Sequence, residues 1–374
     1  MMSKNPLIEL RKLGQSFWYD NISRELINSG ELKRLIDEDG LRGVTSNPSI
    51  FYKSIKGSTV YDELFKSLSG RNDLSDKEIF YELAVRDIQD AADMLKPVYD
   101  ESHGSDGFVS MEVDPSYAYN VSDTVREAGE LFKRINRPNI MIKVPATKEG
   151  LISIRKLISM GININATLLF SVKRYEETTH AYLSGLEDRV RRGEPVDSIQ
   201  SVASFFVSRI DTLTDKILEN RIKSGKSPQE SEKAKKIMGK TAVANAKIAY
   251  RVYKKVFSDE RFLKLKEKGG HIQRLLWGST STKNPGYDDL LYVDNLIGPG
   301  TVNTMPPNTL EAFRDHGKVE RTIDKDLDEA VEVLDTLDKI EVDIGMITDE
   351  LEDDGVRLFR EAFDSLLSLI KEKG

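Results

Sequence analysis

Lys143 stands in an unexpected place for a charged residue. It lies between Ile142 and Val144 in the apolar segment NIMIKVPATKEG, residues 139–150, where a buried strand would normally carry another apolar side chain. An ammonium group loses hydration in apolar surroundings, which favours the neutral amine. A neutral amine can attack a ketone and form a Schiff base, an electron sink for carbon–carbon bond cleavage. The alternatives are that Lys143 extends to solvent or forms an ion pair with Glu112, and the pattern alone leaves these possibilities balanced.

Polar side chains alternate with apolar ones in 107–114 and 161–170, and in 139–145 Lys143 shares one face with Met141 and Pro145. Successive side chains of a strand point to opposite faces, so each segment has one apolar face and one face that carries its polar residues. The residues that share the face of the candidate lysine, or the equivalent face of the neighbouring segments, are Ser110, Glu112, Asp114, Met141, Asn163, Asn165 and Thr167. In a barrel such side chains gather at the mouth, so they predict one common site.

Two further candidates also have a purely local interpretation. Asn47 precedes Pro48 in TSNPSIF, which fits a helix N-cap followed by proline at the first helical position. Asp20, in FWYDNISREL, fits a helix start as well, although Asn21 and Ser23 are available for that role. Taken one at a time, both residues favour the local interpretation.

Composition excludes several classes of chemistry. Among 374 residues there is no cysteine, which excludes disulfides, thiolate metal sites and cysteine nucleophiles. The four histidines, His103, His180, His271 and His316, show no metal-ligand spacing, so no metal site is predicted. The net charge of −7 disfavours nucleic-acid binding and attachment to a membrane surface. No apolar run approaches the roughly 20 residues that span a bilayer, and no signal peptide is recognisable, so we expect a cytoplasmic protein.

The elements that must position the candidate residues are short strands alternating with helices. The apolar or alternating runs are 16–20, 41–47, 107–114, 139–145, 161–170, 201–206, 274–280 and 301–305. Helical patterns include 75–99, 117–134, 171–191, 209–222 and 229–256. About eight strand–helix units predict a (β/α)₈ barrel, a TIM barrel. A doubly wound open sheet is the competing fold, but no G-x-G-x-x-G follows the first strand.

We expect one barrel domain over residues 1–374, with residues 321–374 as appended helices. Phe359, Phe363, Leu366 and Ile370 recur at helical spacing, so the last helix should pack against an apolar surface. The preceding acidic stretch, DKDLDEAVEVLDTLDKIEVD, should form a solvated face.

Four segments resemble the transaldolase family. GVTSNPSIF resembles its first signature, and IMIKVPATKEGLISIRKL resembles the second, whose lysine forms the Schiff base. INATLLFSVKRYEE and SFFVSRID are similar to the fifth and sixth strands with their following loops. The resemblance extends over nearly the whole chain and implies transfer of a dihydroxyacetone unit between sugar phosphates of the pentose phosphate pathway, without a metal or organic cofactor.

The resemblance also implies residue roles. Lys143 would be the nucleophile, Asp20 the base for bond cleavage, and Glu112 with Thr167 would hold a proton-shuttling water. Asn47 and Asn165 would bind donor hydroxyls, Ser204 would contact substrate, and Arg209 would bind phosphate bidentately. Where many relatives have a serine and an arginine after the seventh strand, this chain offers Thr280 and Lys283, and a lysine supplies only a point charge.

Two rival functions are expected to differ at specific residues. Fructose-6-phosphate aldolases, which release dihydroxyacetone to water, are shorter and have glutamine and tyrosine at the positions of Glu112 and Phe206. A catalytically silent sugar-phosphate sensor would be expected to lack Lys143 or Asp20, and both are present. The expected partners are sugar phosphates, and the expected assembly is a monomer or a homodimer.

Overall fold

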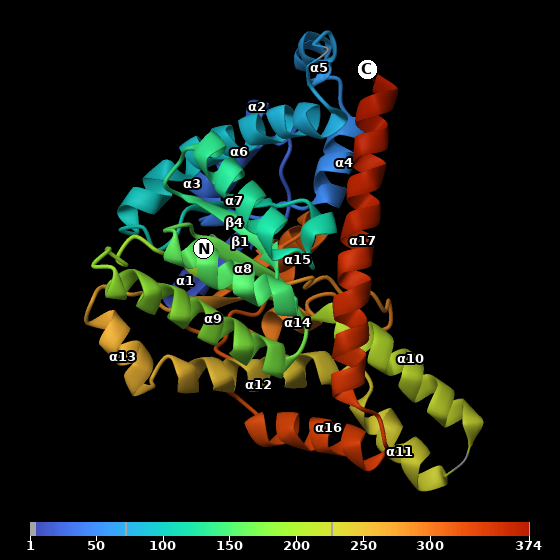
Figure 1. Ribbon diagram of the computed structural model, residues 1–374. Coiled ribbons are helices and arrows are strands. Elements are labelled where there is room, and N and C mark those ends of the chain that lie inside the picture. Colours follow the sequence, from blue (N-terminus) through green and yellow to red (C-terminus); the bar gives the residue numbers. More distant parts are fainter. Residues whose placement is uncertain (1–4, 72, 226, 374) are drawn as a thin grey trace.

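Eight parallel strands close into a barrel in the computed structural model, which describes residues 5–71, 73–225 and 227–373 (Figure 1). The strands follow one another around the barrel in sequence order, and β1 pairs with β8 to close it. They are β1 (Gln15–Tyr19), β2 (Gly43–Val44), β3 (Phe108–Glu112), β4 (Ile140–Pro145), β5 (Ile164–Leu169), β6 (Ser201–Phe206), β7 (Gln273–Gly278) and β8 (Thr301–Met305). The predicted TIM barrel is confirmed.

Helices surround the barrel and follow its strands. They are α1 (Pro6–Lys12), α2 (Arg24–Asn28), α3 (Glu31–Glu38), α4 (Pro48–Lys56), α5 (Asp62–Ser69), α6 (Asp76–Glu101), α7 (Val121–Ile135), α8 (Lys148–Ser159), α9 (Val172–Arg191), α10 (Ser208–Ser224), α11 (Pro228–Ile237), α12 (Thr241–Val256), α13 (Glu260–Lys266), α14 (Leu291–Asp294), α15 (Pro307–His316), α16 (Leu327–Lys339) and α17 (Ile344–Lys373), with a 3₁₀ turn, η1 (Pro115–Tyr117). Among the described residues, no helix is both long and apolar enough to cross a membrane.

Side-chain caps mark the points where strands give way to helices. Asn47 Oδ1 accepts from Ile50 N at 3.1 Å at the start of α4, and Pro48 occupies the first helical position. Thr147 and Ser171 cap α8 and α9 in the same way. These caps satisfy backbone N–H groups that would otherwise lack partners, and so each helix begins close to the carboxyl end of its strand.

The barrel interior is polar at its mouth and has an apolar layer below it, while Ser16, Asp106 and Arg274 form a polar network at the opposite end. Six buried side chains form the apolar layer: Trp18, Phe108, Met141, Val202, Leu276 and Val302. Nearer the carboxyl end, a polar inward side chain follows each of them on the same or a neighbouring strand. This order fits the alternation of side chains, which brings every second residue of a strand to the inner face. The prediction that Met141 and Lys143 share the inner face is therefore confirmed by their common burial inside the barrel.

Two predicted elements differ from the structure. The helix predicted over 229–256 is two helices, α11 and α12, because the chain turns at Gly239, where φ is +69°. The run 41–47 contributes only two strand residues, although Thr45 N still donates to Tyr19 O at 2.9 Å. The chain leaves the sheet there because Asn47 already serves as the cap of α4.

Leu168 departs from the predicted alternation of β5. The pairing of β5 with β6 shifts register between Ala166 and Leu169, and Leu168 adopts a φ of +60°. Its side chain lies against α17, since a Cβ on Gly355 would meet Leu168 Cδ2 at 3.1 Å. The irregularity thus turns an apolar side chain, expected to face the outer helices, toward the last helix.

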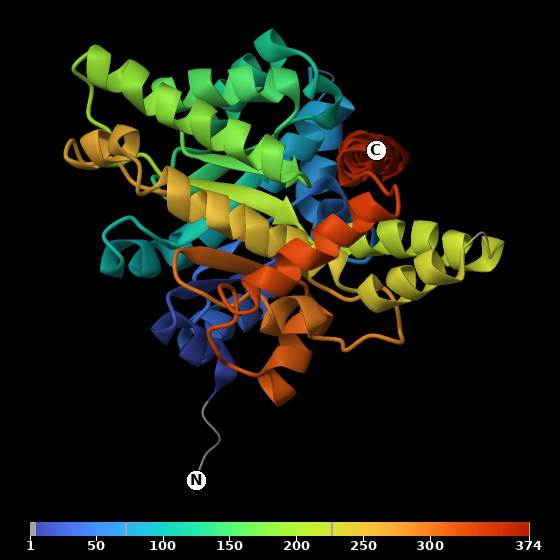
Figure 2. The same ribbon diagram turned by 90° about the horizontal axis from the view of Figure 1, so that it is seen from below.

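The last helix, α17, lies across the mouth of the barrel. It contacts α4, α6, η1, α10 and β5, and in Figure 2 it is viewed nearly along its axis beside the barrel. Phe359, Phe363, Leu366 and Ile370 are all buried, as their spacing predicts. The acidic stretch before it forms α16, whose Ala330, Val333 and Leu337 are buried and whose acidic side chains are mostly exposed.

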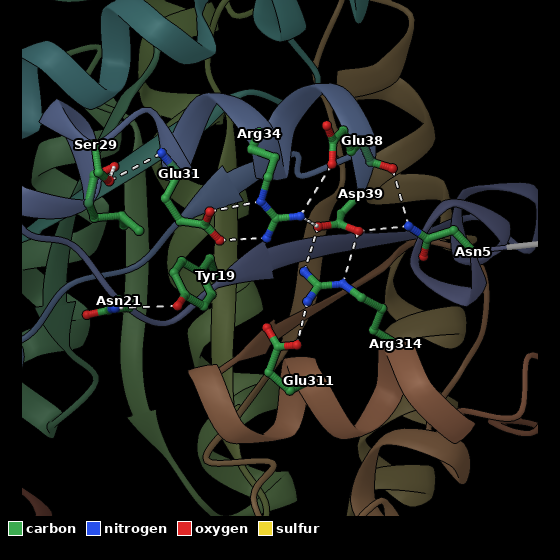
Figure 3. Close-up of polar contacts among 11 residues, drawn as sticks. Asn5, Tyr19, Asn21, Ser29, Glu31, Arg34, Glu38, Asp39, Glu311 and Arg314 are labelled. Carbon is green, nitrogen blue, oxygen red and sulfur yellow. Dashed lines mark hydrogen bonds and ion pairs between the residues drawn. The ribbon is translucent and has the colours of Figure 1, made fainter.

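A polar network closes the seam between the first and last parts of the barrel (Figure 3). Asp39, 2% exposed, follows α3 and accepts from Asn5 Nδ2 at 2.7 Å and from Arg314 of α15 at 2.6 Å. Arg34 lies on the other side of the same carboxylate, 3.7 Å from its Oδ2. This network joins residues far apart in sequence beside the β1–β8 pair.

Candidate active site

A cavity of about 170 Å³ opens at the carboxyl ends of the strands. Seven residues predicted from the sequence line it: Asp20, Asn47, Lys143, Ser204, Phe206, Arg209 and Lys283. They come from five different strands or from the segments that follow them. Active sites of TIM barrels lie at this end, because the loops after the strands converge there.

Lys143 lies on the wall of this cavity and is 4% exposed. Its Nζ donates to Ser46 O at 3.1 Å and to Glu112 Oε2 at 3.3 Å. The ring of Phe359 covers it, with its centroid 5.3 Å from Nζ. The side chain therefore does not extend to bulk solvent, and its ion pair with Glu112 exists together with access to the cavity.

Glu112 faces Lys143 in register on the neighbouring strand. Burial raises the pKa of Glu112 to about 7, although the charge and hydrogen bond of Lys143 act in the opposite direction. Glu112 Oε1 and Thr167 Oγ1 are buried and have no hydrogen-bond partner among the described residues. Neither residue is among those that line the cavity, but both atoms can bind a buried water molecule, and Glu112 can gain or lose a proton near neutral pH.

Asp20 directly follows β1 and is held by a threonine. Thr45 Oγ1 donates to Asp20 Oδ1 at 2.6 Å and lies 2.7 Å from Thr304 Oγ1. Burial raises the pKa of Asp20, while the positive charge of Lys143 and the hydrogen bond from Thr45 oppose that rise. A carboxyl whose pKa is raised in this way is a suitable proton acceptor.

A chain of hydrogen bonds orients the amide of Asn165. Ser204 Oγ donates to Asn165 Oδ1 at 2.6 Å, and Asn165 Nδ2 donates to Ser110 Oγ at 3.1 Å. Asn165 is in register with Lys143 on the adjacent strand. The amide is therefore fixed next to Lys143 by side chains of β3 and β6.

Two cations, Arg209 and Lys283, also line the cavity. Arg209 is in the first turn of α10, and Lys283 is in the loop between β7 and α14. Burial lowers the pKa of Arg209, and the carboxylate of Asp354 opposes this effect. Burial also lowers the pKa of Lys283, with a contribution from the positive charge of Arg209. Neither cation forms an ion pair within the described residues, so both are available to an anionic group.

The structure does not bring Thr280 to the cavity. Thr280 is fully buried, and its Oγ1 donates to Asn303 Oδ1 at 3.1 Å. Its neighbours Ser279 and Ser281 line the cavity in its place. Ser279 adopts a φ of +54°, and this turn reverses the side on which each neighbouring side chain lies.

Several residues of the site were not predicted from the sequence. Thr45 holds Asp20 and is itself hydrogen-bonded to Thr304, and Phe359 forms a wall of the cavity. Thr45 stands within the segment GVTSNPSIF, so strand alternation beyond Val44 could have placed it beside the inner face. The helical spacing of Phe359 showed that it must be buried, but nothing in the sequence showed against what.

In the part of the chain that the structure describes, no three histidine or acidic side chains are grouped so as to hold a metal ion. The groups that can do chemistry here are the amines of Lys143 and Lys283, the carboxyls of Asp20 and Glu112, and the polar side chains around them.

Comparison with known proteins identifies relatives over the full chain. A family model described as transaldolase/fructose-6-phosphate aldolase matches residues 17–370. The chain is 45% identical over 374 residues to a transaldolase of Trichodesmium erythraeum, covering 100% of this chain and 98% of that protein. It is 43% identical over 375 residues to transaldolase 2 of Nostoc punctiforme, with the same coverage. The chain therefore belongs to the transaldolase/fructose-6-phosphate aldolase family.

Proposed function

We propose that this chain is a transaldolase, which transfers a dihydroxyacetone unit from a ketose phosphate to an aldose phosphate through a Schiff base on Lys143. The donor would be sedoheptulose 7-phosphate or fructose 6-phosphate, and the acceptor glyceraldehyde 3-phosphate or erythrose 4-phosphate, in the pentose phosphate pathway. The observation that carries the proposal is the position of Lys143 Nζ: it is buried at the cavity wall, 3.3 Å from Glu112 Oε2.

The first half of the reaction forms the Schiff base. The neutral amine of Lys143 attacks the ketone carbon of the donor and gives a carbinolamine, which then loses water. Its hydroxyl must be protonated before it leaves. Glu112, whose pKa lies at about 7, can supply and recover that proton through a water bound between it and Thr167.

The second half breaks and remakes a carbon–carbon bond. Asp20 takes the proton of the hydroxyl next to the bond that breaks, and the electron pair of that bond moves into the iminium to give an enamine. The aldose product leaves, the enamine attacks the aldehyde of the acceptor, and Asp20 returns the proton. Hydrolysis of the new Schiff base releases the product and regenerates Lys143.

The remaining residues bind the substrate in this proposal. Asn165, fixed by Ser110 and Ser204, and Asn47 would bind donor hydroxyls. Arg209 and Lys283, which form no ion pair within the described part of the chain, would bind the phosphate. In this scheme Thr280 does not contact the substrate, because it lies behind the cavity wall.

Transfer is favoured over release of dihydroxyacetone by the apolar wall near Lys143. Phe206 lines the cavity, and its ring lies 6.4 Å from the ring of Phe359. Neither side chain can donate a proton to the enamine, which would then survive until an acceptor arrives. An aldolase that releases free dihydroxyacetone remains the alternative, and product analysis with and without erythrose 4-phosphate distinguishes the two.

Borohydride trapping tests the proposal. Reduction in the presence of fructose 6-phosphate should leave a dihydroxyacetone-derived mass on Lys143, detected by peptide mass spectrometry. Lys283→Ala is the control, because it removes the other lysine of the cavity and should leave the adduct in place. No adduct, or an adduct on another lysine, would refute the Schiff-base role.

We further propose a cytoplasmic location, as expected for an enzyme of sugar phosphate metabolism, and a monomer or homodimer. Sedimentation of the purified chain measures the assembly directly, and a larger oligomer would contradict this part of the proposal.

A further inference from the structure

Two aspartates of α10 form matching sets of hydrogen bonds that the proposed reaction does not use. Asp211 Oδ1 accepts from Ala242 N at 2.7 Å, and its Oδ2 accepts from the hydroxyl of Tyr292 at 3.0 Å. Asp215, one helical turn later, accepts from Gly239 N at 3.0 Å and from the hydroxyl of Tyr287 at 2.8 Å. Each carboxylate thus joins α10 both to the α11–α12 junction and to a tyrosine that follows β7.

Tyr287 anchors the loop that carries Lys283. Residues 283–286 of this loop are exposed, whereas Tyr287 is half-buried. The ring of Tyr287 packs on Gly239, where an added Cβ would lie only 2.7 Å from Tyr287 Cζ. The hydroxyl bond to Asp215 and this close contact therefore hold the exposed part of the loop against α10.

The loop needs such an anchor because of its charge. Lys283 faces the same cavity as Arg209, and the positive charge of Arg209 helps to lower the pKa of Lys283. The two positive charges repel each other, and the carboxylates of Asp354 and Asp20, which form no ion pair with them, offset this repulsion only in part. The remaining repulsion favours movement of an exposed loop away from α10. A phosphate between the two cations would relieve the repulsion, but only if Lys283 is already held opposite Arg209.

We infer that Tyr287 with Asp215, and Tyr292 with Asp211, are positioning pairs that hold Lys283 opposite Arg209 and thereby determine the affinity for the donor phosphate. The inference rests on the proposed function, since it assigns a role to residues around its phosphate site. The two pairs touch neither the reacting atoms nor Lys143. They act through the loop 279–290 and the start of α10.

Tyr287→Phe tests this inference because it removes one hydroxyl and keeps the ring on Gly239. The KM for fructose 6-phosphate should rise roughly 3–10-fold, the effect of one lost hydrogen bond, while kcat changes little. With unphosphorylated fructose as donor, kcat/KM should stay the same. In a Lys283→Ala background, Tyr287→Phe should have no further effect on KM, and Tyr292→Phe in the otherwise unchanged chain should act in the same direction as Tyr287→Phe.

Tyr250→Phe is the matched control. Its hydroxyl donates to Pro299 O at 2.9 Å, before β8 and thus at the opposite end of the barrel, so the KM for fructose 6-phosphate should not change. An unchanged KM in Tyr287→Phe, an equal loss for both donors, or the same increase in the Lys283→Ala background would overturn the inference. These outcomes leave the Lys143 adduct in place, whereas absence of that adduct in the unmodified protein refutes the proposed function itself.

Discussion

At the scale of single residues, Lys143 and Glu112 form a buried ion pair that still has unused bonding capacity. Their Nζ and Oε2 atoms lie 3.3 Å apart on adjacent strands, and Ser46 O holds the amine from a second side. Because Glu112 leaves its Oε1 without a partner among the described residues, the pair does not use all its bonding capacity. An ion pair whose only role is structural is usually fully satisfied.

The proposed role of Asp20 predicts a block after Schiff-base formation. In Asp20→Asn, Thr45 can still donate to the amide oxygen, so the fold should persist. Turnover should fall by about 10²–10⁴-fold, the usual contribution of a positioned base. Borohydride should nevertheless trap an adduct of the intact donor on Lys143, because the amine is untouched. Near-normal turnover in this variant would contradict the role.

The pH dependence of Asp20 follows from the same geometry. A base must be ionised to act, and burial raises its pKa above the ordinary value of 3.8. The acid limb of kcat/KM for the unmodified protein should therefore lie above pH 3.8. A limb at or below that pH, after correction for acid unfolding, would show that another group is responsible.

The raised pKa of Glu112 predicts that the stability of the fold depends on pH. Its pKa is about 7 in the fold against an ordinary value of 4.5, so the folded state holds the proton more tightly. The corresponding stabilisation is fully present below pH 4.5 and is lost as pH rises through 7. Relative to Glu112→Gln, the free energy of unfolding should thus decrease by up to about 1.4 kcal/mol for each pH unit in this window.

Urea unfolding at several pH values measures this effect. Glu63→Gln is the control, since Glu63 is exposed on α5 and its charge is hydrated in both states. A difference between Glu112→Gln and the unmodified chain that does not vary with pH would contradict the assignment.

At the scale of elements, α17 supplies what the barrel strands cannot. Phe359 covers Lys143 from above, and Gly355 allows Leu168 to approach the helix closely. The barrel positions the polar groups, and α17 adds an apolar cover over them. An enamine persists until an acceptor binds only if water, which could protonate it, is excluded from the site.

This arrangement predicts that Phe359 controls the ratio of products. In Phe359→Leu the cover is smaller, so water should reach the enamine and more free dihydroxyacetone should form without acceptor. The measurement is the ratio of free dihydroxyacetone to dihydroxyacetone units transferred to the acceptor. Leu358→Ala, on the same helix but 40% exposed, should leave the ratio unchanged.

Phe359→Ala extends the same test. It should raise the ratio further and lower the free energy of unfolding by about 3–5 kcal/mol, as for other buried phenylalanines. An unchanged ratio in both Phe359 variants would show that the cover is not needed.

At the scale of the whole molecule, closing the barrel depends on joining the two ends of its chain. Asp39 lies at that seam and binds Arg314 of α15 and Asn5 before α1 (Figure 3). Its carboxylate is buried, so loss of Arg314 leaves it with Asn5 and the more distant Arg34 as its remaining partners.

Arg314→Ala should therefore lower the free energy of unfolding by about 1–3 kcal/mol. Arg86→Ala provides the comparison, because Arg86 forms an ion pair with Asp90 on the surface of α6 and its side chain is 64% exposed. That change should cost less than about 1 kcal/mol. Equal losses of unfolding free energy in the two variants would mean that the seam network contributes no more stability than an exposed ion pair.

Much of this molecule could be predicted from local patterns. Strand alternation correctly placed Lys143, Glu112 and Asn165 inside the barrel, because each strand is short and regular there. The predictions were wrong where the backbone departs from regular strand or helix geometry. The positive φ values of Leu168 and Ser279 changed the direction of side chains, and neither residue type signals such a conformation in one sequence. At Gly239 the glycine is a helix-stop signal, and the turn there divides the predicted helix in two.

The eight-unit architecture and the chemical types at the site could be predicted from the sequence, since they depend on periodicity and on residue identity along short segments. The structure was needed to show which distant groups meet. It placed Phe359 over Lys143, Thr45 and Thr304 beside Asp20, and Thr280 behind the wall. Such contacts join residues tens or hundreds of positions apart, and their geometry arises from packing of the whole chain, which no local pattern encodes.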